Sequence, residues 1–85
     1  RWIAWQYDRP ETGEGMIQAF RRPQSEEAAA DYRLRDLDPA RSYDVTDIDT
    51  GVTRRLSGAD LLHQGLKVTI DAKPGSALIT YRQVD

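Results

Sequence analysis

The sequence predicts an all-β protein, an antiparallel β-sandwich of about six to eight short strands with one helical turn near residues 58–63. Apolar and polar residues alternate in short runs, which is typical of strands that bury one face. Clusters of Gly, Pro, Asp and Ser separate these runs, as turns would. No long stretch repeats its apolar residues with helical spacing, so we expect no long helix.

The first two runs predict a hairpin. The run RWIAWQYD, at residues 1–8, is rich in aromatic residues and is followed by the turn-rich segment RPETGEG. Its alternation gives one face made of Ile3, Trp5 and Tyr7, and another made of Trp2, Ala4 and Gln6. The second run, GMIQAFRR at residues 15–22, ends where Pro23 removes a backbone donor.

The middle of the chain predicts one ambiguous segment and a second hairpin. Good helix formers follow the capping residue Ser25, whereas Tyr32 and Leu34 alternate with arginines as in a strand. We interpret this segment as a loop followed by a strand over about residues 29–34. A turn at Pro39 then precedes a strand at 42–49, and Gly51 suits a turn with positive φ before a short strand at 52–56.

The segment SGADLLHQGL, at residues 57–66, predicts an isolated helical turn. Ser57 can cap its start, and Asp60 places negative charge in its first turn. Leu61 and Leu62 give the turn an apolar side, and Gly65 can end it in the left-handed conformation. We expect this turn to form a corner that closes the open end of the sandwich with its leucines.

The last two runs predict a third hairpin, with KPG as its turn. Residues 66–71 place Leu66, Val68 and Ile70 inward, and the run SALITYRQV alternates in the same way. We expect the interior of the sandwich to be shared by the side chains of Ile3, Val45, Val68 and Ile79.

Length and composition exclude several classes of function. A chain of 85 residues makes a single domain with a small core, so a large active-site cleft is not expected. The net charge of −2 provides no cationic stripe for nucleic acid, and no apolar run approaches the roughly 20 residues that span a membrane. The absence of cysteine excludes thiolate chemistry and fits a reducing compartment, so we expect a cytoplasmic protein.

No group of residues predicts a catalytic, metal or cofactor site. His63, the single histidine, is expected to be a surface or capping residue. Asp44, Asp47 and Asp49 offer carboxylates to a hard cation such as Ca²⁺, but the sequence DIDTG is better explained as a turn. Chance pairs of carboxylates are unavoidable with 14 acidic residues, so they do not predict a glycosidase centre.

The aromatic residues Trp2, Trp5 and Tyr7 allow two interpretations. An exposed row of flat rings can stack on sugar rings, which would make the first strand a carbohydrate-binding surface. The interpretation we favour is that these rings build the core or pack against a neighbouring domain.

Four segments carry a resemblance to a known family, and together they cover nearly the whole chain. They are WIAWQYDRPETGEGMIQAFRR, YRLRDLDPARSYDVTDIDTG, SGADLLHQGLKVTI and PGSALITYR. In this order they resemble the C-terminal β-sandwich of the family 36 glycoside hydrolases, the α-galactosidase group. The most specific segments are LDPARSYDV and SGADLLHQGL, and Asp36 departs from the pattern because glycine is expected before Leu37.

The resemblance implies a role without catalysis for this piece of the enzyme. The parent chain would hydrolyse terminal α-galactosides by a retaining mechanism, using two aspartates in a central (β/α)₈ barrel that lies outside this sequence. Residues 1–85 would be the C-terminal accessory domain, cut from a longer chain, with the barrel of that chain as its partner and without a cofactor. The alternatives are an autonomous carbohydrate-binding module that uses Trp2, Trp5 and Tyr7, and a protein-interaction sandwich unrelated to sugars.

Overall fold

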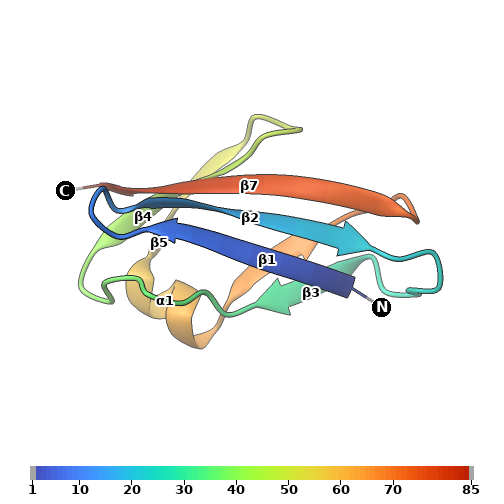
Figure 1. Ribbon diagram of the computed structural model, residues 1–85, viewed down its shortest axis with the longest axis horizontal. Coiled ribbons are helices and arrows are strands. Elements are labelled where there is room, and N and C mark those ends of the chain that lie inside the picture. Colours follow the sequence, from blue (N-terminus) through green and yellow to red (C-terminus); the bar gives the residue numbers. More distant parts are fainter. Residues whose placement is uncertain (1, 85) are drawn as a thin grey trace.

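The computed structural model describes residues 2–84 and has seven antiparallel strands and one short helix in this range (Figure 1). The elements are β1 (Trp2–Arg9), β2 (Glu14–Arg21), β3 (Ala29–Tyr32), β4 (Ser42–Asp47), β5 (Thr53–Ser57), α1 (Gly58–His63), β6 (Leu66–Thr69) and β7 (Gly75–Val84). Five strands form one sheet in the order β1-β2-β7-β4-β5, and β3 pairs with β6 in a second sheet. The predicted all-β antiparallel fold is therefore confirmed.

Two of the three predicted hairpins are present. β1 pairs with β2 along its whole length, from Trp2 opposite Arg21 to Arg9 opposite Glu14. β4 pairs with β5, and Gly51 in the connection between them has a φ of +75°. The strand predicted over about 29–34 is shorter, because β3 ends at Tyr32.

The prediction of a third hairpin, with KPG as its turn, is wrong. β6 pairs with β3 in the smaller sheet, whereas β7 lies between β2 and β4 in the larger one. The segment that contains Lys73 and Pro74 therefore carries the chain from one sheet to the other, and it is not a hairpin turn. Both strands bury alternate residues, so their period matches a hairpin and a crossing between facing sheets equally well.

The predicted helical turn is confirmed as α1. The Ser57 hydroxyl accepts a hydrogen bond from the backbone N–H of Asp60 at 3.0 Å, and Gly65 follows the helix with a φ of +95°. Leu61 is completely buried, and its carbonyl accepts a hydrogen bond from the N–H of Leu34. The helix therefore closes one end of the core, as we expected of a corner.

The core lies between the larger sheet, the smaller sheet and α1. Its buried hydrophobic residues are Ile17, Ala19, Leu34, Leu37, Tyr43, Val45, Leu61, Leu66, Val68, Ile70, Ala77, Ile79 and Tyr81. The expectation that Ile3 joins this interior is wrong. Ile3 lies opposite Phe20 in the β1–β2 ladder, whereas its neighbour Ala4 lies opposite the buried Ala19 and packs against the core.

Arg21 is a charged residue in the interior, with only 5% of its surface exposed. The guanidinium donates five hydrogen bonds to four backbone carbonyls. Two go to Ser25, and one each goes to Glu26, Ile70 and Asp71. Hydrogen bonding of this kind is what makes a buried guanidinium tolerable. The side chain thereby fastens the loop after β2 to the segment after β6.

The departure from the family pattern at Asp36 falls at an unusual backbone position. Asp36 has a φ of +64°, and it is the one described residue other than glycine with a positive φ. The left-handed region favours glycine, while Asp is one of the few side chains that tolerates it. The backbone therefore adopts the conformation that glycine favours although the residue is Asp.

Candidate functional site

The larger sheet has one face that no described element covers. We call it the outer face, and the opposite face carries the core. Its residues are Ile3, Trp5, Tyr7 and Arg9 from β1, Glu14, Met16, Gln18 and Phe20 from β2, Ser76, Leu78, Thr80 and Arg82 from β7, Asp44 and Thr46 from β4, and Thr53 and Arg55 from β5. Trp5 is 48% exposed, Tyr7 54% and Met16 39%. Large exposed apolar residues that gather on one face usually mark a contact surface.

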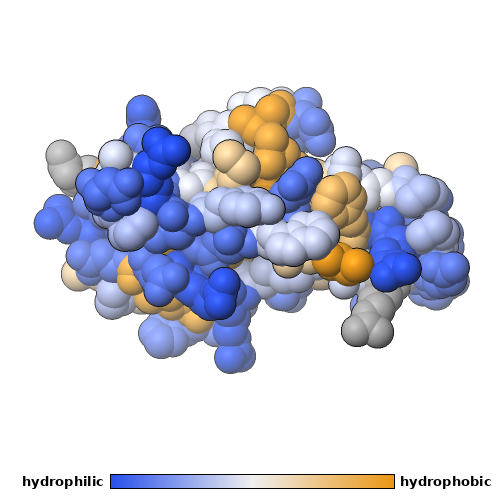
Figure 2. Space-filling view, in the orientation of Figure 1, coloured by the Kyte–Doolittle hydropathy of each residue, from blue (hydrophilic) through white to orange (hydrophobic). Residues whose placement is uncertain are grey.

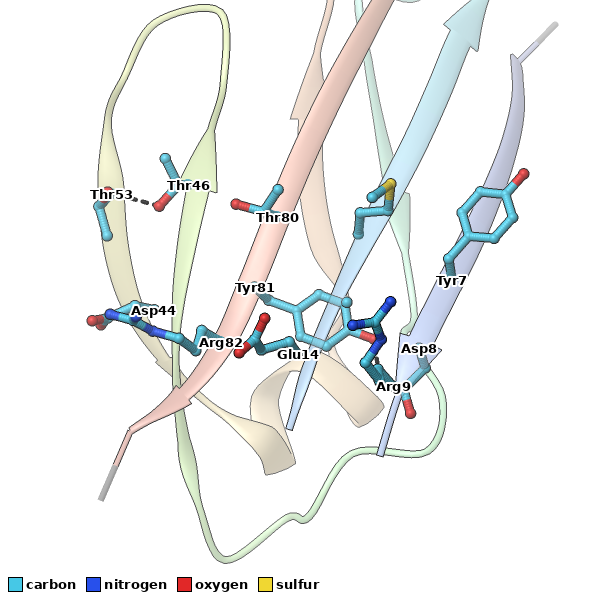
Figure 3. Close-up of a pocket in the computed structure, with 12 residues that line it drawn as sticks. Tyr7, Asp8, Arg9, Glu14, Asp44, Thr46, Thr53, Thr80, Tyr81 and Arg82 are labelled. Atoms are coloured by element: carbon cyan, nitrogen blue, oxygen red, sulfur yellow. Dashed lines mark hydrogen bonds between the residues drawn. The ribbon is translucent and has the colours of Figure 1, made fainter. Parts of the chain in front are cut away.

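The strand register arranges the outer face in rows that run across the sheet. One row alternates in charge, and from β5 to β1 it consists of Arg55, Asp44, Arg82, Glu14 and Arg9. Figure 3 shows Asp44, Arg82, Glu14 and Arg9 next to one another in this order. Opposite charges on neighbouring strands stabilise a sheet, so the row is neutralised largely within itself.

Arg55 and Asp44 make the closest ion pair in this row. The guanidinium donates from Nε to Oδ1 at 3.0 Å and from Nη2 to Oδ2 at 3.3 Å. The hydrogen bond from Arg55 lowers the pKa of Asp44, and the charges of Arg55 and Arg82 lower it further. The Asp44 carboxylate is therefore held in its ionised form.

The next row lines a shallow hollow. From β5 to β1 it consists of Thr53, Thr46, Thr80, Met16 and Tyr7. The hydroxyls of Thr46 and Thr53 are hydrogen-bonded to each other at 2.8 Å, as Figure 3 shows. The hollow has a volume of about 740 Å³ and lies between this row and the charged row.

The rows beyond the hollow are mainly apolar. One contains Leu78, Gln18 and Trp5, and the next contains Ser76, Phe20 and Ile3. The rings of Trp5 and Phe20 meet edge to face, with centroids 5.7 Å apart. In Figure 2, orange and near-white residues lie in the middle part of the view, over β1, β2, β7 and the β4–β5 connection of Figure 1, and hydrophilic residues lie at both ends.

Tyr81 lies beneath the hollow, on the core side of the sheet. Its ring passes across Gly15, where any side chain would collide with it. The Tyr81 hydroxyl donates to Oδ1 of Asp8 and accepts from Nε2 of Gln6 at 2.9 Å. Burial, and then the hydrogen bond to Asp8, raise the pKa of Tyr81, so the phenol keeps its proton.

Gln6 extends this network to the loop after β3. Its Nε2 donates to the carbonyl of Arg35 at 2.8 Å, and its Oε1 accepts from the N–H of Arg35 at 2.9 Å. A side-chain amide thus pairs with the backbone as a neighbouring strand would. The network fixes β1, β7 and this loop to one another.

The three predicted sugar-binding residues do not share one face. Trp5 and Tyr7 lie on the outer face, but Trp2 points to the other side of β1 and packs against the core. The indole N–H of Trp2 donates to the carbonyl of Glu27 at 3.0 Å. The ring centroids of Trp2 and Tyr32 are 6.3 Å apart.

The other candidate residues are far from forming a site. His63 is exposed in the last turn of α1. Oδ1 of Asp47 accepts from the backbone N–H groups of Asp49 and Thr50, which is the turn geometry expected for DIDTG. Among residues 2–84, no group of three His, Cys, Asp or Glu side chains is placed to hold a metal ion.

The rows of the outer face were not predicted from the sequence. The alternation within each strand is visible in the sequence, but the rows depend on strand order, and β7 inserts between β2 and β4. A signal was nevertheless present, since Glu14, Asp44 and Arg82 are charged residues on the side of their strands opposite to the buried residues. No helix in residues 2–84 has the length and apolar character needed to cross a lipid bilayer.

These features define a small two-sheet antiparallel β-domain with one open sheet face that carries an apolar part and a charged row. Its sequence and fold can be placed among known proteins. The chain belongs to the glycosyl hydrolase family 36 C-terminal domains, whose family model matches residues 2–80.

Solved structures show a similar fold. The galactosidase domain of alpha-galactosidase-sucrose kinase, AgaSK, matches 98% of this chain with a TM-score of 0.76 and 22% sequence identity. The chain spans only 11% of that protein chain. A search of curated proteins finds no match.

Proposed function

We propose that residues 1–85 are the non-catalytic C-terminal accessory domain of a longer, α-galactosidase-like glycoside hydrolase. The domain packs against the catalytic barrel of its own chain and stabilises it, while the barrel hydrolyses terminal α-galactosides. The observation that carries this proposal is the match of the family model to residues 2–80. We also propose a cytoplasmic location, which the absence of cysteine supports.

The state of the carboxylates supports a role without catalysis. A retaining glycosidase needs two neighbouring carboxyl groups, one of which has a raised pKa and serves as the acid. The hydrogen bond from Arg55 lowers the pKa of Asp44 and favours its ionised form, which cannot donate a proton.

A deletion in the full-length enzyme tests this proposal. Removing the domain should lower the melting temperature and the yield of folded enzyme. The 85-residue chain alone should give no turnover of p-nitrophenyl α-galactoside. Hydrolysis by this chain that is abolished by one carboxylate substitution would falsify the proposal. A truncated enzyme as stable as the full-length enzyme would also contradict it.

A second candidate function, binding of carbohydrate, is favoured by the geometry of β1. Trp5 and Tyr7 are exposed on the same face, beside a hollow lined by threonine hydroxyls. Flat rings beside hydrogen-bonding groups are suited to hold a pyranose. Galactose or raffinose should then quench tryptophan fluorescence in a saturable way that Trp5→Ala removes. Trp2→Phe serves as the control, because Trp2 lies on the other side of β1.

A further inference from the structure

We propose that the outer face is the surface by which this domain packs against the catalytic domain of its own chain. This inference rests on the proposed function and adds the location of the interface. The contact would centre on Trp5, Phe20 and Leu78, with the charged row along one border.

The outer face has the composition of a protein interface. Such interfaces have an apolar, aromatic-rich centre and a polar rim. Here Trp5 is exposed in the centre, Tyr7 and Met16 are exposed beside it, and the row from Arg55 to Arg9 forms a border of charged groups. In the β4–β5 connection, Ile48 and Val52 are 50% and 56% exposed, so apolar surface continues beyond the strands.

A second copy of this chain fits the outer face poorly. Face-to-face pairing with full overlap requires a two-fold axis in the plane of the interface. An axis along β7 places Arg82 on Arg82 and Asp44 on Glu14, since the charged row reads the same from both ends. An axis across the strands places the charged row on the apolar rows. Either arrangement sets like charges together or buries charges against apolar groups.

A sugar covers too little of this surface to be its main occupant. The apolar rows extend over β1, β2 and β7, and they contain only Gln18 and Ser76 as polar side chains. The hydroxyls of Thr46 and Thr53 are already paired with each other. A protein surface fits better, and the matched galactosidase chain has this fold as only 11% of its length. The larger part of such a chain supplies the occupant.

The partner surface can be described by its chemistry. It is apolar where it meets Trp5 and Phe20, and it carries an excess of carboxylates where it meets the charged row. That row holds three arginines and two acids, and one acid, Asp44, is already bound to Arg55. An acidic border on the partner would complement the remaining positive charge.

Hydroxyl-radical footprinting of the full-length chain tests this inference directly. The oxidation of Trp5, Tyr7 and Met16 is measured by mass spectrometry in the native chain and in the urea-unfolded chain, and the oxidation of the exposed His63 is measured beside them as a reporter for another part of the surface. An open outer face predicts native-to-unfolded ratios near the exposed fractions of 48%, 54% and 39%. A covered face predicts ratios of about 0.1 or less, because the centre of an interface excludes water.

A pair of matched substitutions supplies the control. Met16→Lys places a charge in the outer face, and Thr69→Lys places the same charge on the exposed side of β6. If the outer face is the interface, Met16→Lys raises the oxidation of Trp5 about fivefold, since an unpaired charge opens an apolar contact. Thr69→Lys leaves the oxidation of Trp5 unchanged.

The other outcomes separate this inference from the proposed function. If Trp5, Tyr7 and Met16 react freely while His63 is protected, the domain packs through another surface, and only the inference fails. If all four react as freely as their exposure allows, the inference fails, and the deletion experiment decides whether the proposed function fails with it. Protection that disappears when the enzyme dissociates into single chains identifies a second copy as the occupant. Protection that requires added galactose identifies carbohydrate, and either result overturns the inference.

Discussion

Two inward-facing polar residues, Gln6 and Arg21, provide contacts that a larger second sheet would provide in a bigger sandwich. Gln6 pairs through its amide with both backbone groups of Arg35. Arg21 collects five backbone carbonyl contacts from two loops that meet beside β2 and β6. The second sheet has only two strands, so these side chains satisfy backbone groups that lack a neighbouring strand.

The positive φ of Asp36 leads to a reversed order of stability between glycine and alanine. At this position Asp36→Gly should be more stable than Asp36→Ala by about 1 kcal/mol, because only glycine adopts the left-handed conformation without steric cost. At the exposed strand residue Asp31 the order should be the usual one, with Ala more stable than Gly. Urea denaturation of the four variants measures both differences. The same order at both positions would contradict the backbone geometry at Asp36.

The ion pair between Arg55 and Asp44 predicts how stability depends on pH. Asp44 has a lowered pKa in the folded protein, so the pair stabilises the fold above the unfolded pKa, and this stability is lost as the pH falls through the folded pKa. Arg55→Ala should raise the pKa of Asp44, which an NMR titration of its carboxyl carbon measures. Arg54→Ala should leave it unchanged, because Arg54 lies opposite Val45 on the other side of the sheet. An equal effect of both substitutions would refute the role of the pair.

At the scale of elements, the sequence predicted what depends on neighbouring residues and missed what depends on distant ones. Periodicity and caps predicted the β1–β2 hairpin, the β4–β5 hairpin and α1. The pairing of β6 with β3 and the central place of β7 were missed, since the alternation of a strand does not identify its neighbour. The rows of the outer face were missed for the same reason, because they form only after β7 enters the sheet.

The start of α1 provides a test of how closely the elements pack. A Cβ atom at Gly58 would collide with the backbone carbonyl of Asp38, which cannot move as freely as a side chain. Gly58→Ala should therefore lower the free energy of unfolding by about 1–3 kcal/mol. At Gly51 a Cβ atom would meet no atom within 4 Å. Gly51→Ala should therefore lower the free energy of unfolding by only about 1 kcal/mol, because the positive φ of this residue disfavours alanine. Thermal denaturation ranks the two variants, and the opposite ranking would show that the corner is loosely packed.

At the scale of the whole molecule, the inner face of the larger sheet serves folding, and the outer face is open for association. The inner face shares its residues with the smaller sheet and α1, and burial there holds the fold together. The outer face leaves Trp5, Tyr7 and Met16 in contact with water, so it contributes little to folding. Stability and association should therefore respond to substitutions on different faces.

This separation can be measured with one substitution on each side. Leu61 is completely buried, so Leu61→Ala should lower the unfolding free energy of the 85-residue chain by about 2–5 kcal/mol. Met16→Ala, on the open face, should lower it by at most about 1 kcal/mol. If the outer face packs against the catalytic domain as we propose, Met16→Ala should lower the unfolding free energy of the full-length enzyme by more than that of the short chain. If Met16→Ala has the same small effect in both chains, the outer face is not buried against the rest of the enzyme.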